Sequence, residues 1–302
     1  MIIDIPATTT GAVNKKLVEV RETGGAVTLG RVLTLVVSTD DDGNAESVIS
    51  AANDASREHP CRVIVVTRGD REVETRLDAQ IRVGGDAGAS EVVVLRLYGE
   101  LAGHEDSVVI PFLLPDTPVV AWWPDRLPAV PAQDPLGRLA VRRITDATGA
   151  ADPAATIRSL LGTYTAGDTD LAWARATPWR ALLTAAVDQP PHENVLSATV
   201  SGLGQEPAVD LIAGWLASRI DGPVRRRTGD LHIELHRETE SISLSRPQLG
   251  KTATLSRTGA PDALVSLARR ETRDCLAEDL RRLDPDEVYR AALAGLERVI
   301  WE

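Results

Sequence analysis

The stretch VLTLVV, from Val32 to Val37, is a continuous run of aliphatic and β-branched residues. A run without polar alternation is typical of a β-strand buried on both faces. Residues 45–58 follow with apolar side chains at helical spacing, and residues 62–67 form a second apolar run after Pro60. A strand, a helix and a strand in close succession predict a right-handed crossover with parallel strands, so the predicted fold class is α/β.

The rest of the N-terminal half extends this sheet. Alternating or continuous apolar runs predict further strands, and helical spacing predicts further helices. We expect strands at 77–83, 91–98 and 119–122, helices at 11–23 and 102–113, and glycine-rich turns at 24–25 and 84–88.

The C-terminal half repeats the same order of elements: strand, helix, several strands, helix. An internal duplication is one explanation, although residue identity between the halves is weak. We expect strands at 195–201, 224–227, 231–235, 242–244 and 253–255, helices at 207–220 and 263–283, and a last helix capped by Asp284, with Glu287 reaching back to the cap.

The positions of several prolines indicate where helices start and where the chain divides into domains. Asp152-Pro153 and Thr177-Pro178 each resemble a helix start, and Pro190-Pro191 resembles a boundary. The predicted architecture is therefore an α/β domain at 1–150, a helical connecting segment at 151–190, and a second α/β domain at 191–302 that ends in two helices.

Composition restricts the function classes. The chain has 302 residues, 43% hydrophobic and 25% charged, which is typical of globular proteins. The net charge is −11 and only three lysines are present, which argues against nucleic acid or an anionic membrane as partner. Residues 1–13 do not resemble a signal peptide, and prolines interrupt the apolar stretch 108–123, so we expect a cytoplasmic protein without a membrane span.

The common catalytic motifs are absent from the sequence. No G-x-S-x-G, H-E-x-x-H or GK[ST] pattern occurs. His232 and His236 alternate on one side of a predicted strand, where two solvated polar residues are favoured over two metal ligands. Cys61 and Cys275 alone cannot form a disulfide framework or a zinc site; inert buried thiols are favoured over a redox pair. We therefore expect no catalytic residue, no metal and no cofactor.

One glycine-containing turn resembles a dinucleotide-binding loop. Residues 202–207 read GLGQEP between a predicted strand and helix, and the basic run 225–227 lies beyond it, where an NADP phosphate could bind. Pro207, however, stands where that loop needs its third glycine. A βα loop with proline at the helix start accounts for the same residues, and we favour it.

The most unusual segment is GDTDLAWARATPWR, residues 167–180. In a structural interpretation its acids cap a helix and pair with its arginines, while its indoles fill a core. In a functional interpretation, tryptophan beside arginine forms an interface hot spot or a sugar-phosphate pocket. Both interpretations concern Asp168, Asp170, Trp173, Arg175, Thr177, Trp179 and Arg180.

This segment closely resembles the signature of OpcA-type glucose-6-phosphate dehydrogenase assembly proteins of actinobacteria. Four further segments resemble the family in the same order, so the resemblance spans almost the whole chain. They are GRVLTLVV (30–37), PVVAWWP (118–124), RRITD (142–146) and LRRLDPDEVYRAAL (280–293).

The resemblance implies a non-catalytic protein that assembles or allosterically activates glucose-6-phosphate dehydrogenase in the oxidative pentose phosphate pathway. Because indoles and guanidinium groups cluster in residues 167–180, we expect them to line or support the partner surface, together with Trp122 and Trp123. Cyanobacterial relatives link activation to thioredoxin, but this chain has no C-x-x-C pair. The alternative is a sensor or enzyme for a sugar phosphate or NADP that uses the Asp, Arg and Trp cluster at 168–180.

Overall fold

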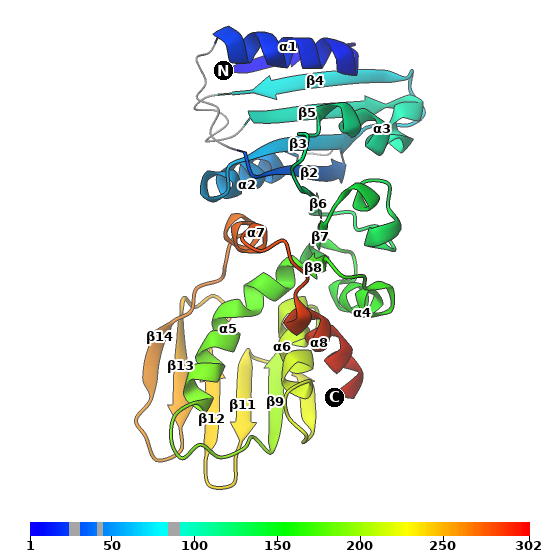
Figure 1. The fold of residues 1–302 in the computed structure, drawn as a ribbon. Coiled ribbons are helices and arrows are strands. Elements are labelled where there is room, and N and C mark those ends of the chain that lie inside the picture. The colour runs from blue at the N-terminus through cyan, green and yellow to red at the C-terminus, as the bar shows by residue number, and fades with distance from the viewer. Residues whose placement is uncertain (24–30, 41–44, 84–90) are drawn as a thin grey trace. The chain divides into compact units, whose positions relative to one another are not determined.

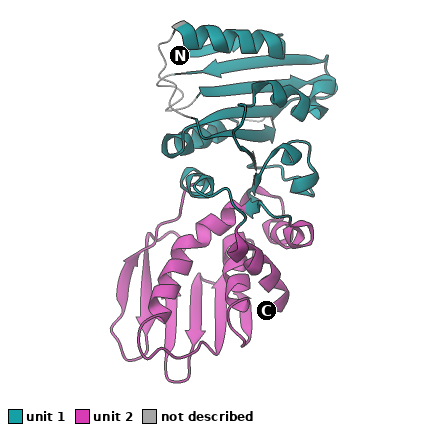
Figure 2. Ribbon diagram, in the orientation of Figure 1, with its two compact units in different colours: residues 1–146, 165–169, 272–285 teal, residues 147–164, 170–271, 286–302 magenta. Residues whose placement is uncertain are grey.

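Two compact units make up the chain in the computed structural model, which describes residues 1–23, 31–40, 45–83 and 91–302 (Figure 2). Unit 1 contains residues 1–146, 165–169 and 272–285, and unit 2 contains residues 147–164, 170–271 and 286–302. Each unit has its own sheet and its own hydrophobic core. The glycine turns expected at 24–25 and 84–88 lie outside the described residues.

The sheet centred on unit 1 has eight strands in the order β1-β4-β5-β3-β2-β6-β7-β8 (Figure 1). β2 pairs in parallel with β3 and β6, while β4 pairs antiparallel with β5 and β1. The strands are β1 (Ile2–Ile5), β2 (Leu33–Asp40), β3 (Cys61–Arg68), β4 (Arg76–Arg82), β5 (Glu91–Tyr98), β6 (Val119–Trp123), β7 (Arg142–Thr145) and β8 (Asp168–Asp170).

The predicted crossover is confirmed, and with it the α/β class. β2 is buried along all but its last residue, and α2 (Ala45–Glu58) connects it to the parallel strand β3. The apolar face of α2 buries Val48, Ile49 and Ala52. α2 also packs against α7 (Thr272–Leu280), and Arg281 Nη2 lies 2.9 Å from Glu58 Oε2.

The remaining helices of unit 1 are short or lie at its start. α1 (Thr10–Thr23) contributes Val13 and Leu17 to the core. The helix expected at 102–113 is divided at His104, because the chain changes from 3₁₀ to α geometry there. Its pieces are η2 (Gly99–Gly103), α3 (Glu105–Val109) and η3 (Ile110–Phe112).

Unit 2 is built on a seven-stranded sheet in the order β14-β13-β12-β11-β9-β10-β15. β10 pairs in parallel with β9 and β15, and the other pairs are antiparallel. The strands are β9 (Ser197–Gly202), β10 (Val224–Thr228), β11 (His232–His236), β12 (Ser241–Ser245), β13 (Thr252–Arg257), β14 (Ala263–Ser266) and β15 (Val299–Trp301).

Helices cover this second sheet (Figure 1). α5 (Leu171–Val187) contacts β12, and α6 (Pro207–Ala217) contacts β9 and β10. α4 (Pro153–Thr163) and α8 (Glu287–Gly295) pack against α6. The alternating burial of β9, β11 and β12 follows directly, because successive side chains point to opposite faces.

The long helix expected at 263–283 is wrong. The leucine spacing that suggested it combines a strand, an irregular segment and the shorter helix α7. Leu264 is 76% exposed in β14, whose backbone pairs with β13, whereas Leu276 and Leu280 are buried in unit 1. Backbone pairing with β13 outweighs the helical spacing of Leu264 and Leu267 at the start of the expected helix.

Two expected helix starts are also wrong. α5 begins at Leu171, so Thr177-Pro178 lies inside a helix rather than at its start. The cap of the last helix is Asp286, whose Oδ1 accepts the N–H groups of Val288 and Tyr289, each at 2.9 Å. Asp284 instead offers its carbonyl oxygen to Arg142 Nη1 at 3.0 Å.

α6 and α8 approach closely because glycine stands at their contact. A Cβ atom on Gly214 would lie 2.2 Å from the carbonyl oxygen of Ala292, and one on Gly295 would lie 2.0 Å from that of Gly214. Side chains at either position would push the helices apart.

We therefore expect Gly214→Ala to destabilise the protein by about 1–3 kcal/mol, the usual range for overpacking. Gly162→Ala, in α4 with nothing within 4 Å of the added Cβ, is the matched control. It should stabilise by about 0.5–1 kcal/mol through helix propensity. Urea unfolding followed by circular dichroism measures both; equal effects of the two changes would contradict the close contact.

Candidate functional site

Asp168, the first acidic residue of the segment 167–180, has a structural role. Gly167 has φ of +98°, and a Cβ there would lie 2.4 Å from the carbonyl oxygen of Val141, so only glycine fits. Asp168 accepts a hydrogen bond from Arg143 Nε, and its Oδ2 accepts the Thr165 N–H at 2.7 Å. The RRITD and GDTD motifs are thus joined inside unit 1 by a buried ion pair.

The second acid, Asp170, is fully buried and begins α5. Its Oδ1 accepts the Ala172 N–H at 2.8 Å, which confirms the expected helix cap. Its Oδ2 accepts the Ala147 N–H at 2.9 Å. Both carboxylate oxygens therefore serve the backbone of unit 2.

Trp173 connects α5 to the cap of α8. Its Nε1–H donates to Asp286 Oδ2 at 2.8 Å, and its ring centroid lies 5.9 Å from that of Tyr289. The guanidinium carbon of Arg180 lies 3.4 Å from the centroid of Trp173, on the ring face, and Arg180 Nη2 donates to Thr177 Oγ1 at 2.7 Å. The segment 167–180 and the C-terminal motif 280–293 therefore meet in unit 2.

Pro178 leaves a defined gap in the hydrogen bonding of α5. A helical residue at this position would donate its N–H to the carbonyl oxygen of Ala174, but proline has none. Arg270 Nη1 donates to that oxygen instead, at 2.9 Å. The proline is accommodated because an arginine from a distant segment replaces its donor.

Arg175 and Trp179 line one pocket of unit 2. Trp179 is buried, and Arg175 Nη1 donates to Thr148 Oγ1 at 3.2 Å. Trp173, Thr177 and Arg180 thus form one cluster, while Arg175 and Trp179 belong to a second.

Trp122 and Trp123 lie in β6 of unit 1, each only 1% exposed. Trp122 lies opposite Val37 in the sheet, and Trp123 belongs to the hydrophobic core. In this structure neither indole reaches the surface.

The turn that resembles a nucleotide-binding loop is held by its own chain. Arg226 is buried; its Nε donates to Asp210 Oδ1 at 2.8 Å and its Nη2 to the Leu203 carbonyl at 2.6 Å. Burial raises the pKa of Asp210 despite this pairing. Arg225 and Arg227 pair with Glu302, at 3.2 and 2.6 Å. Every arginine of the run 225–227 therefore has a carboxylate partner.

The histidine pair and the cysteines show no further site in the described residues. His232 and His236 flank Glu234 on one face of β11, with Nε2 at 3.9 and 3.8 Å from Glu234 Oε2. Across the described ranges no group of three His, Cys, Asp or Glu side chains is placed to hold a metal. Cys61 and Cys275 are both buried free thiols.

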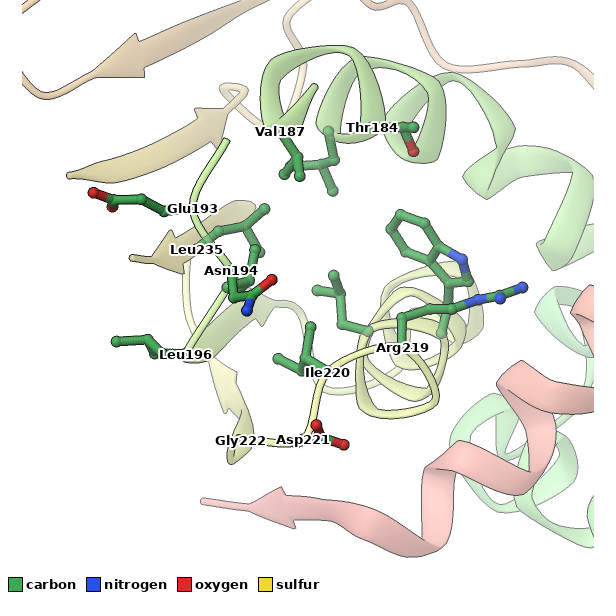
Figure 3. A pocket seen from close by; sticks show the side chains of 14 residues that line it. Thr184, Val187, Glu193, Asn194, Leu196, Arg219, Ile220, Asp221, Gly222 and Leu235 are labelled. Atoms are coloured by element: carbon green, nitrogen blue, oxygen red, sulfur yellow. The ribbon is translucent and has the colours of Figure 1, made fainter. Parts of the chain in front are cut away.

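A large groove of unit 2 was not anticipated from the sequence. It has a volume of about 710 Å³ and lies between the C-terminal parts of α5 and α6 and the segment 193–196 (Figure 3). Its walls are apolar and include Trp215, Ile220 and Leu235, while Glu193, Arg219 and Asp221 carry charges on its lining. Leu196 is 54% exposed there. The sequence analysis placed Leu196 in the strand expected at 195–201, and no local pattern indicated a groove beside it.

No helix among the described residues is long and apolar enough to cross a membrane.

Comparisons with known proteins agree with the motifs. The glucose-6-phosphate dehydrogenase subunit N-terminal domain matches residues 52–161, and the C-terminal domain of the same subunit matches residues 166–293. No curated protein matches the chain.

The chain also matches solved structures that are distant from it in sequence. Aldose-aldose oxidoreductase from Caulobacter crescentus has 11% identity and a TM-score of 0.46, over 88% of this chain and 95% of that one. Glucose-6-phosphate 1-dehydrogenase from Mycobacterium avium has 12% identity and a TM-score of 0.44, over 88% of this chain and 91% of that one.

The two domain matches follow one another in order and together span most of the sequence, so the chain belongs to the OpcA family of glucose-6-phosphate dehydrogenase assembly proteins.

Proposed function

We propose that the protein performs no chemistry itself and acts by docking onto glucose-6-phosphate dehydrogenase, favouring the assembled or active enzyme. The observation that carries this proposal is the match of both family domains, each described as a part of the dehydrogenase subunit. An activator shifts an equilibrium only by binding the active state more tightly than the inactive one. A difference of about 1–3 kcal/mol corresponds to several-fold to hundredfold activation.

The polar contacts of the segment 167–180 support a role without catalysis. Asp168 accepts hydrogen bonds from Arg143 and from a backbone N–H, and both oxygens of Asp170 accept backbone N–H groups. Acids bound in this way to their own chain are poorly suited to proton transfer. This weakens the alternative of an enzyme that uses Asp168 and Asp170.

We propose the groove of Figure 3 as the surface that contacts the dehydrogenase. Protein interfaces bury an apolar centre, often with tryptophan, inside a polar rim. The groove has that character: Trp215 and Ile220 lie inside, Leu196 is exposed, and Glu193 and Arg219 offer charges for orientation.

The tryptophans of the motifs then act as support for the contact surface. Trp173, Trp179 and Arg180 position α5 against its neighbours, and the C-terminal part of α5 forms one wall of the groove. Trp122 and Trp123 stabilise unit 1 from within its sheet. The buried free thiols Cys61 and Cys275 are in keeping with the cytoplasm as the site of action.

We expect Leu196→Asp to weaken binding of the dehydrogenase at least about tenfold, because the change places a charge in an apolar contact. The matched control is Leu264→Asp, which alters an even more exposed leucine, 76% against 54%, outside the groove. Light scattering of the mixture reports assembly, and NADPH formation reports activation.

If both variants bound the dehydrogenase equally weakly, or if Leu196→Asp bound it as the unaltered chain does, the groove would not be the contact surface. If the unaltered chain changed neither the mass nor the rate of its cognate dehydrogenase, the docking function itself would be wrong.

We expect Trp173→Phe to lower the free energy of unfolding by about 1–3 kcal/mol, because it removes the hydrogen bond to the half-buried carboxylate of Asp286 while keeping an aromatic side chain. Trp301→Phe, at a 40% exposed indole, should change it by less than about 0.5 kcal/mol. At saturating concentration Trp173→Phe should still activate the dehydrogenase. A folded variant without any activation would instead place this indole in the contact surface.

A further inference from the structure

Unit 2 has a second, smaller pocket at the N-terminal end of α6. Its volume is about 170 Å³, and its lining includes Trp179, Pro207, Ile212, Arg246 and Arg269. Four arginines and one carboxylate, that of Glu206, contribute to it. The pocket is therefore strongly cationic, in a chain whose net charge is −11.

Arg246 is the central observation. The residue is only 5% exposed, its Nη1 donates to the Leu267 carbonyl at 2.8 Å, and its guanidinium carbon lies 5.2 Å from the ring centroid of Trp179. Its Nε is buried and has no hydrogen-bond acceptor in the described part of the chain.

Other buried arginines of unit 2 differ from Arg246 in one respect. Arg226 pairs with Asp210 at 2.8 Å, and Arg237 pairs with Glu240 at 2.8 Å. Within the described residues, Arg246 has no carboxylate at ion-pair distance. A buried guanidinium without a counter-charge is unfavourable, so an anion bound here would be stabilised.

Two neighbouring groups strengthen the positive potential of the pocket. Arg269 is more than half exposed, and its Nη2 lies 3.3 Å from the Gln248 carbonyl and 3.4 Å from Glu206 Oε1. α6 has eleven residues, and the side chain of Glu206 makes no capping hydrogen bond at its start. The positive end of the helix dipole therefore faces this region without a side-chain cap.

The titration behaviour of Arg246 agrees with this geometry. Burial lowers its pKa, and the positive charge of Arg269 lowers it further, while Glu206 acts in the opposite direction.

We propose that this pocket binds a small organic phosphate. Its phosphate group accepts hydrogen bonds from Arg246 and Arg269 beside the start of α6, and its uncharged part contacts Trp179, Pro207 and Ile212. Guanidinium groups bind phosphate through paired N–H donors, and a phosphate dianion has enough oxygens for two arginines and a helix end. The volume is below the roughly 300–1,000 Å³ typical of drug-sized ligands, so the ligand has only a few carbon atoms.

Binding here does not depend on docking to the dehydrogenase, so the full chain alone is tested. Calorimetry and thermal unfolding are followed with glycerol 3-phosphate, inorganic phosphate and succinate, at an ionic strength held constant with sodium chloride. Glycerol 3-phosphate should bind and raise the midpoint of thermal unfolding, and the other two should bind more weakly.

Three substitutions locate the site. Arg246→Gln should weaken binding at least about tenfold, since it removes a charged donor. Arg269→Gln, at an exposed side chain that does not endanger the fold, should weaken it about threefold to tenfold. Glu206→Gln removes the resident negative charge and should tighten binding several-fold, an effect that misfolding cannot imitate. Arg290→Gln, at a 60% exposed arginine of α8, is the matched control and should leave binding unchanged.

The proposal is overturned if glycerol 3-phosphate gives no effect beyond that of sodium chloride, or if Arg269→Gln and Glu206→Gln bind it as the unaltered chain does. Tighter binding of succinate would overturn the assignment to phosphate. If inorganic phosphate bound as tightly as glycerol 3-phosphate, the assignment of an organic phosphate to this pocket would be wrong.

Discussion

The carboxylate of Asp286 is the point on which the helical layer of unit 2 depends. It accepts three hydrogen bonds: from the Val288 and Tyr289 N–H groups at the start of α8, and from the Trp173 indole of α5. Without it, all three donors would lose this acceptor at a partly buried position, which is costly. One side chain thus both begins a helix and fixes its position against another.

From this point the packing continues to the proposed contact surface. α8 packs against α6 through Gly214 and Gly295, where the two backbones come too close for any side chain. α5 contacts α6 in turn, and the C-terminal parts of these two helices form the walls of the groove. Trp173 and Trp179 are buried in α5, the helix whose C-terminal part lines the groove, so they stabilise one of its walls without lining it.

The buried arginines of the described residues differ in whether a carboxylate pairs with them. In unit 1, Glu91 accepts contacts from Arg21, Arg31 and Arg62; burial acts to raise its pKa, but these arginines outweigh burial and hold the pKa below its usual range. Burial lowers the pKa of Arg62 to about 10. Such buried groups are stable because opposite charges meet. Arg246 is buried and, among the residues that the structure describes, has no carboxylate at ion-pair distance, which distinguishes the pocket that it lines.

Local chemistry alone was enough to predict many elements. The aliphatic run of β2, the amphipathic face of α2 and the Asp152 and Asp170 caps depend on neighbours within a few residues, and the structure has all of them. Prediction failed where a distant group decides the local state. Pro178 lies within a helix because Arg270 replaces its donor, and Leu264 lies in a strand because β13 offers an edge.

The α/β class and, through several long motifs in order, the family can be recognised in the amino-acid sequence, because they depend on side-chain period and on residue identity. Three further features depend on contacts between distant residues: which of the notable side chains are buried, the pairing of Asp168 with Arg143, and the place of residues 272–285 in unit 1. Both pockets belong to this second group. They are formed by residues far apart in the chain, and no local pattern records which segments will meet when the apolar faces of helices and sheets are buried together.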